Sequence, residues 1–283
     1  MKINKSFILI CIVLFTCILL GLSHCQKNKP ADSKNIETTT STTSKTTETT
    51  TEKPKKREIN PDDKLIALTF DDGPYSPVTE KILDTLEENN SVATFFVVGN
   101  RLEGNSEYQA SLKRAFDLGC EIGSHTYTHT YLTKLSAEKR AEELKKTDNI
   151  VKQITGKGID ILRPPGGFCV EDVNYPLILW SVDSMDWKYR ETTADYNNVV
   201  NSVFDGCIIL MHDLYPASAD AAAKFIPELI SQGYKFVTVS ELAEARGITF
   251  ENGKRFSAVR PEPPTETETE SQTNTTVLDN IVE

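Results

Sequence analysis

The sequence predicts an α/β fold whose parallel strands are joined by helices. Apolar strand-like runs alternate with helix-like runs from residue 61 to residue 256, and polar residues directly follow several of the strands. No glycine-rich turn of the dinucleotide-binding kind follows the first strand. A barrel and an open doubly wound sheet both fit this alternation. Because an eight-unit barrel typically takes about 250 residues, a stretch of roughly 200 residues favours fewer units, or a barrel with some degenerate units.

The first elements follow from apolar patterning. The run Lys64–Phe70 predicts a buried strand. Ser76 and Pro77 form an N-cap and first-turn pair, and they open a helix whose apolar face carries Val78, Ile82, Leu83 and Leu86. The run Val92–Val98 predicts the next strand.

The same alternation continues along the chain. We expect helices at Ser106–Leu118, Ala137–Ile154 and Ala219–Ser231. We expect strands at Glu121–Gly123, Ile159–Arg163, Leu177–Val182, Cys207–Met211 and Lys235–Val239. In either parallel architecture, chemistry belongs at the carboxyl ends of the strands.

The segments outside residues 61–256 have other compositions. In residues 1–25, lysines precede an apolar run at 7–22, which predicts a signal peptide or membrane anchor. A cleaved signal, a retained anchor and a lipid attached at Cys25 all fit this segment. Residues 26–60 are rich in Thr, Lys and Glu, and residues 257–283 in Pro, Thr and Glu, which predicts a disordered linker and tail or a glycosylated stalk.

Charge and cysteine content exclude two classes of protein. The formal net charge of −10 and a pI of about 5.1 argue against general nucleic-acid binding, which needs clustered basic residues. Three of the six cysteines lie in residues 1–25, leaving Cys120, Cys169 and Cys207 for the domain. This odd number predicts no disulfide scaffold.

Two acids follow the first strand. Asp71 and Asp72 stand directly before Gly73 and Pro74, which turn the chain and expose both carboxylates at the strand end. Adjacent carboxylates repel each other unless a cation lies between them. A simple turn is the alternative interpretation.

Two of the four histidines, His125 and His129, are four residues apart. On a helical turn, both imidazoles would face the same way and could bind one metal ion together with Asp72. Structural histidines are the alternative.

Three further runs follow predicted strands. Arg163 begins a stiff Pro-Pro-Gly-Gly loop, where it could orient one of the paired acids while the backbone N–H groups of Gly166 and Gly167 stay uncovered for an oxyanion. Asp183, Asp186 and Trp187 share a loop that suits a sugar surface. His212 ends a strand, where a nearby carboxylate would raise its pKa and make it a proton donor.

Together these runs resemble the polysaccharide deacetylase family, carbohydrate esterase family four. The resemblance covers about Lys64–Ala245 and rests on five motifs in order: TFDDGP, HTYTH, RPPGG, DSMDW and LMHD. It implies a distorted (β/α) barrel with fewer than eight units, a seven-stranded barrel of the TIM type. It also implies one divalent metal ion, for which we expect Zn²⁺, with Co²⁺ as the alternative.

The resemblance also implies roles for single residues. Asp72, His125 and His129 match the metal ligands, Asp71 matches the general base, and Arg163 matches the residue that holds the base.

The proton donor and the substrate pocket are carried over in the same way. His212 matches the general acid and Asp186 the carboxylate that tunes it, while Trp187 and Leu210 match walls of the acetyl pocket. Gly166 stands where the family often has an aromatic residue, so its N–H can serve as oxyanion donor but an aromatic wall is lost.

We therefore expect a monomeric hydrolase that removes acetyl groups from N-acetylglucosamine in peptidoglycan or chitin-like polymers. We expect it at the cell surface or outside the cell, attached to the membrane through its N-terminal segment or a lipid at Cys25, or secreted. An acetylxylan esterase, a non-catalytic carbohydrate-binding protein and a stalk with a structural head remain alternatives.

Overall fold

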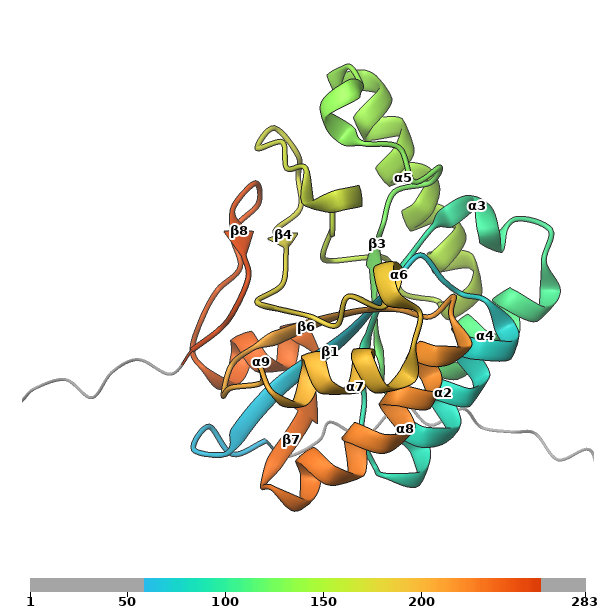
Figure 1. The fold of residues 1–283 in the computed structure, drawn as a ribbon. Coiled ribbons are helices and arrows are strands. Elements are labelled where there is room, and N and C mark those ends of the chain that lie inside the picture. Colours follow the sequence, from blue (N-terminus) through green and yellow to red (C-terminus); the bar gives the residue numbers. More distant parts are fainter. Residues whose placement is uncertain (1–58, 261–283) are drawn as a thin grey trace, which may run out of the picture. The chain divides into compact units, whose positions relative to one another are not determined.

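The sheet is organised around one buried strand, β1 (Figure 1). The computed structural model describes residues 59–260. Every residue of β1 after Lys64 is buried, because this apolar strand pairs in parallel on both edges. It pairs with β6 on one edge, and with β7 and then β2 on the other. The strands are β1 (Lys64–Asp71), β2 (Thr94–Val97), β3 (Glu121–Ser124), β4 (Leu177–Ile178), β5 (Val182–Asp183), β6 (Ile208–His212), β7 (Tyr234–Val237) and β8 (Arg255–Phe256).

The sheet closes on itself through a single-residue bridge. Ser124, at the end of β3, bridges to Leu162, and Leu162 bridges to Leu177 in β4. The chain from β4 runs directly into β5, which pairs with β6 and so returns to β1. The Leu162 segment thus takes the place of a full strand. The fold is a distorted (β/α) barrel with fewer than eight units, as the resemblance to the polysaccharide deacetylase family implies.

Helices surround the sheet (Figure 1). Neighbouring helices pack in the order α5, α4, α2, α8, α7. The α-helices are α2 (Ser76–Glu88), α3 (Gly99–Leu102), α4 (Ser106–Asp117), α5 (Ala137–Thr155), α6 (Asp186–Tyr189), α7 (Thr192–Val200), α8 (Pro216–Ser231) and α9 (Val239–Ala245), with short 3₁₀ turns at η1 (Leu132–Lys134) and η2 (Pro165–Gly167).

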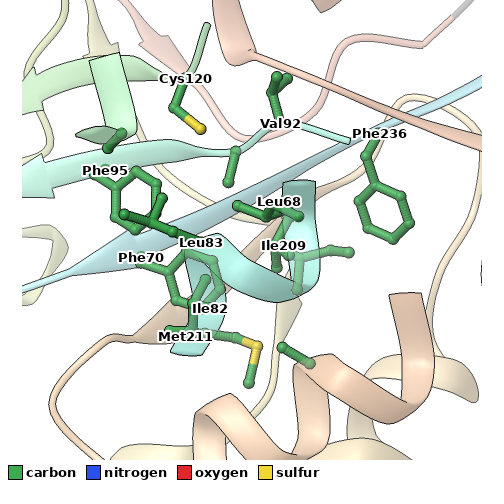
Figure 2. Packing of buried hydrophobic residues seen from close by; sticks show 14 of the residues in the cluster. Leu68, Phe70, Ile82, Leu83, Val92, Phe95, Cys120, Ile209, Met211 and Phe236 are labelled. Atoms are coloured by element: carbon green, nitrogen blue, oxygen red, sulfur yellow. The ribbon is translucent and has the colours of Figure 1, made fainter. Parts of the chain in front are cut away.

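The main core lies between the sheet and the helices. Leu68 and Phe70 of β1 pack with Ile82 and Leu83 of α2 in one buried cluster (Figure 2). The rings of Phe70 and Phe95 stack with centroids 5.3 Å apart. This packing fixes the carboxyl end of β1, which carries Asp71, and with it the start of the loop that carries Asp72.

Some local predictions from the sequence are wrong. Ser76 is not the N-cap of α2; Tyr75 is, and it makes no side-chain cap. The expected strand Ile159–Arg163 is reduced to the bridge at Leu162. The N–H of Ile159 donates to the side chain of Asp148 instead of a strand, and the prolines that follow Arg163 cannot extend a ladder. The short or weakly apolar elements α3, α6, α7, α9 and β8 were not predicted.

Several predicted segments lie outside the described residues. These are the signal or anchor at 1–25, the linker at 26–60 up to residue 58, and the tail from 261 to 283. Ala258 pairs with Cys207 and Val259 is buried, so packing continues past residue 256. Within residues 59–260, no helix is both long and apolar enough to cross a membrane, and Cys120, Cys169 and Cys207 form no disulfide with one another.

Candidate active site

The candidate residues gather at the carboxyl ends of adjacent strands. Asp71 ends β1 and is in register with His212, the last residue of β6. His125 follows β3, and Arg163 follows the bridge at Leu162. Neighbouring strands lie about 4.8 Å apart, so the parallel sheet alone brings these residues to one edge.

Asp72, His125 and His129 form a three-ligand cluster. Asp72 Oδ1 lies 3.1 Å from His129 Nε2 and 3.5 Å from His125 Nε2. One ligand atom from each of the three residues lies within 4.8 Å of the other two. A tetrahedral metal ion with bonds of about 2.0–2.2 Å separates its ligand atoms by about 3.3–3.6 Å. The spacing therefore fits a single small cation.

The hydrogen bonding of Asp72 supports the same interpretation. Its Oδ1 is buried and has no hydrogen-bond partner of good geometry among residues 59–260. Burial would raise the pKa of Asp72, but the contact with His129 and the charges of His125 and His129 outweigh it and lower the pKa to about 2. Two imidazole nitrogens and one carboxylate oxygen are a typical donor set for a catalytic zinc-type site.

The cluster is held by strained backbone and not by a helical turn. The predicted helical turn across His125 and His129 is wrong, because residues 125–129 form no helix. Asp72, Thr126 and His129 instead have φ values of 73°, 68° and 59°, in the left-handed region that non-glycine residues seldom adopt. Such a residue costs about 1–3 kcal/mol and persists only where its surroundings fix it.

The two imidazoles differ in environment. His125 is buried, and its Nδ1 donates to the backbone oxygen of Arg163 at 2.7 Å, which directs Nε2 towards Asp72. Burial lowers the pKa of His125, against the opposing charges of Asp71 and Asp72, and so favours the neutral form that binds metals. His129 is more exposed, and its contact with Asp72 raises its pKa despite partial burial.

Arg163 is fully buried and holds Asp71. Its Nη1 donates to Asp71 Oδ1 at 2.8 Å and to Thr69 Oγ1 at 2.7 Å. Its Nε and Nη2 donate to the backbone oxygens of Ile178 and Leu179. Asp71 Oδ2 makes no hydrogen bond to Arg163 and lies 3.6 Å from His125 Nε2, facing the three-ligand cluster.

His212 and Asp186 form a second buried pair. Nδ1 of His212 donates to Asp186 Oδ1 at 2.7 Å, and Asp186 Oδ2 accepts from the backbone N–H of His212 and from Ser218 Oγ. Burial would lower the pKa of His212, but the hydrogen bond and charge of Asp186, together with the charges of Asp71 and Asp72, raise it to about 9. The imidazole is therefore cationic at neutral pH.

The side chain of Asp213, the residue after His212, lies beside Gly73 and α2. Its carboxylate accepts from Thr79 Oγ1 at 2.6 Å and occupies the space beside Gly73. A Cβ atom at residue 73 would lie 2.0 Å from Asp213 Oδ1, so only glycine fits between the two aspartates and Pro74.

The predicted substrate-binding residues are close in sequence to residues of this centre: Gly166 follows Arg163, Trp187 follows Asp186, and Leu210 precedes His212. Trp187 is 47% exposed in α6, while Leu210 is buried in β6. Gly166 has a φ of 64°, which favours glycine. The expectation that the N–H of Gly167 is uncovered is wrong, because it donates to the Pro164 oxygen.

Two aromatic rings stand beside Gly166. Tyr131 and Phe168 contact each other with ring centroids 5.0 Å apart, and Phe168 is 51% exposed. A Cβ atom at Gly166 would lie 3.0 Å from the Phe168 ring. An aromatic surface therefore exists near this position despite the glycine.

Thr69 and Ser218 support Arg163 and Asp186, and neither is among the residues predicted from the sequence. Thr69 links Arg163 to the Ile209 oxygen, and Ser218 fixes Asp186. Thr69 is the one polar residue in the run Leu65–Phe70, which is a usable signal. Ser218 lies 32 residues from Asp186, and no local pattern marks it.

The chain is similar in sequence to known polysaccharide deacetylases. Residues 58–177 match the polysaccharide deacetylase family model. The peptidoglycan-N-acetylmuramic acid deacetylase PdaC of Bacillus subtilis is 40% identical over 197 residues, which is 68% of this chain and 42% of PdaC. The peptidoglycan-N-acetylglucosamine deacetylase PgdA of Listeria monocytogenes is 42% identical over 183 residues, 63% of this chain and 39% of PgdA.

A solved structure extends the likeness to the whole domain. The family 4 acetyl xylan esterase from Clostridium thermocellum, in complex with a cobalt ion, is 31% identical with a TM-score of 0.65. The alignment covers 69% of this chain and 99% of that one. The chain spans only about two fifths of the length of PdaC and PgdA.

The three-ligand cluster predicts a metal-binding phenotype. His129→Ala removes one of three ligands at a partly exposed position, and should weaken Co²⁺ or Zn²⁺ binding at least about 100-fold, more than loss of an outer partner does. Calorimetric titration of the metal-free protein measures this. Asp71→Asn is the control, because Asp71 lies outside the three-ligand cluster. Equal affinities of the parent and His129→Ala would contradict the assignment.

Proposed function

Because this chain belongs to the polysaccharide deacetylase family, we propose that it removes N-acetyl groups from amino sugars of bacterial peptidoglycan and releases acetate. The proposal rests on the arrangement of three groups of side chains. The cluster of Asp72, His125 and His129 is bordered by the Asp71–Arg163 pair and by the His212–Asp186 pair. An amide hydrolase needs such a combination of electrophile, proton acceptor and proton donor.

Asp72, His125 and His129 would hold one divalent cation. When bound, the cation lowers the pKa of a water molecule and polarises the acetyl oxygen. Zn²⁺ suits the two nitrogens and one oxygen of this donor set, and the cobalt ion bound to the C. thermocellum esterase makes Co²⁺ the second candidate.

Asp71 acts as the general base. Arg163 holds Oδ1, so Oδ2, which faces the cluster, is the atom that takes the proton of the attacking water. The other guanidinium hydrogen bonds of Arg163 go to backbone oxygens and Thr69, which prevents its rotation away from Asp71.

His212 acts as the general acid. An amine anion is a very poor leaving group, so the sugar nitrogen must be protonated as the C–N bond breaks. Asp186 engages Nδ1, which leaves Nε2 as the ring atom that delivers the proton.

The substrate pocket is proposed around Gly166, Trp187 and Leu210. The Gly166 N–H would donate to the developing oxyanion, a contribution worth about 10²- to 10³-fold in rate. Trp187 and Leu210 would border the acetyl methyl group. Tyr131 and Phe168 would offer the sugar the aromatic surface that Gly166 lacks.

The proposed location is the cell envelope, outside the membrane. The apolar run at residues 7–22 would act as signal or anchor, with a lipid at Cys25 as the other route, and the Thr-rich linker would extend the domain towards the wall. Both curated relatives described above are named as peptidoglycan deacetylases. We propose that the domain acts as a monomer.

Acetylxylan O-deacetylation is the second candidate function. It is favoured by the likeness of the whole domain to the C. thermocellum acetyl xylan esterase. A leaving alcohol needs less protonation than a leaving amine, so an esterase would depend less on His212.

Acetate release tests the proposal. The protein should release acetate from peptidoglycan faster than from chitin oligomers or acetylated xylan, and a chelator should abolish the reaction until Zn²⁺ or Co²⁺ is restored. Asp71→Asn should lower kcat by about 10²-fold or more through loss of the base while keeping metal affinity. Chelator-insensitive release, or release from xylan alone, would refute the proposal.

The high pKa of His212 predicts the basic limb of the pH profile. Since the acid form is required, kcat/KM should fall as pH rises through about 9. Asp186→Asn removes the main interaction that raises this pKa, so the limb should move towards the ordinary histidine value of about 6.5. Asp220→Asn, an exposed change on α8, is the control. An unmoved limb in Asp186→Asn would show that His212 is not the titrating acid.

A further inference from the structure

A glutamate outside the five sequence motifs contacts the loop between the two histidines. Oε2 of Glu143, on α5, accepts from the backbone N–H of Tyr127 at 2.9 Å and of Thr128 at 2.7 Å. Both carboxylate oxygens also accept from Thr128 Oγ1, at 3.0 and 3.1 Å. The Glu143 side chain therefore accepts from three neighbouring donors of the loop, namely the N–H groups of Tyr127 and Thr128 and the Thr128 hydroxyl.

The opposite side of the same loop is held by α3. The backbone oxygens of Thr126 and Tyr127 accept from the N–H groups of Gly99 and Asn100 at 3.0 and 2.9 Å. The loop thus lies between two helices, one pairing with its oxygens and the other with its N–H groups. Charged acceptors make stronger hydrogen bonds than neutral ones, so Glu143 adds a strong restraint to the backbone pairing with α3.

The position of Glu143 is itself well defined. The next residue, Leu144, is buried, as is Thr147 one turn further along α5, and Thr147 Oγ1 donates to the Glu143 backbone oxygen at 3.0 Å. These anchors attach the helix to the domain. The carboxylate therefore acts from a rigid support and not from a flexible surface chain.

The loop needs such a restraint because of its backbone. Thr126 and His129, on either side of the Glu143 contacts, both have positive φ values. Without the carboxylate, the N–H groups of Tyr127 and Thr128 lose this acceptor, and the left-handed residues can relax. His129 would then move away from Asp72 and His125.

We propose that Glu143 is a positioning residue that sets the affinity of the three-ligand cluster for its metal ion by holding the 126–129 loop in its strained form. The inference rests on the proposed function, since it takes Asp72, His125 and His129 as the metal ligands. Outer partners of metal ligands typically change affinity by 10- to 100-fold.

The test compares four metal-free proteins titrated with Co²⁺ and Zn²⁺: the parent, Glu143→Ala, Glu143→Gln and the control Glu142→Ala. Glu142 is the adjacent acid on α5, and it pairs with Lys146 instead of the loop. We expect the dissociation constant to rise about 10- to 100-fold in Glu143→Ala and by a smaller factor in Glu143→Gln, whose amide keeps one acceptor oxygen. Glu142→Ala should match the parent.

Melting temperature without metal separates positioning from general stabilisation. We expect the metal-free melting temperatures of Glu143→Ala and Glu142→Ala to be similar, and the rise on adding metal to be smaller in Glu143→Ala. A lower metal-free melting temperature with unchanged metal affinity would overturn the inference. If Glu143→Ala does not fold, Glu143→Gln decides, and a parental dissociation constant in that variant overturns it.

The two proposals fail in different ways. A parent protein that binds neither metal would refute the proposed function, and the inference with it. A parent that binds metal and a Glu143→Ala variant that binds it equally well would refute only the inference.

Discussion

The buried guanidinium of Arg163 is the interaction on which the site depends. It lies between β1, β2 and the segment after β4, with its charge over the Phe96 ring at 4.2 Å and paired with Asp71. The backbone oxygen of Arg163 accepts from Nδ1 of His125 and so fixes the orientation of that ring. One residue therefore orients both the proposed base and a proposed metal ligand. Removing one partner of a buried ion pair typically costs about 3–5 kcal/mol. Loss of either Asp71 or Arg163 would therefore leave an uncompensated charge in the core.

The second feature is backbone strain at the proposed metal site. Three non-glycine residues with positive φ, Asp72, Thr126 and His129, are proposed ligands or lie beside one. The surrounding hydrogen bonds hold these conformations before any ligand arrives. This pre-organisation reduces the reordering that binding would otherwise require. The neutral state favoured at His125 and the cationic state favoured at His212 separate ligand from acid by environment alone.

The sequence predicted those parts of the fold that depend on local patterns. β1 was predicted within one residue, because a continuous apolar run between turn residues permits little else. The location of the site at the carboxyl edge of the sheet was also predicted, because parallel strands bring their carboxyl ends to one edge. The helical turn at His125–His129 was wrong because its backbone is fixed by Gly99, Asn100 and Glu143, which are distant in sequence. Glu143 and Ser218 were missed for the same reason, since a polar residue on a helix surface has no local mark of a long-range contact.

The proposed function requires one cation to bind between Asp72, His125 and His129. Anomalous diffraction at the zinc edge, from crystals grown with Zn²⁺, locates the ion directly. We expect one strong peak about 2.0–2.2 Å from Asp72 Oδ1 and from Nε2 of each histidine. A strong peak elsewhere with none at this position, or no peak in crystals that contain stoichiometric zinc, would contradict it.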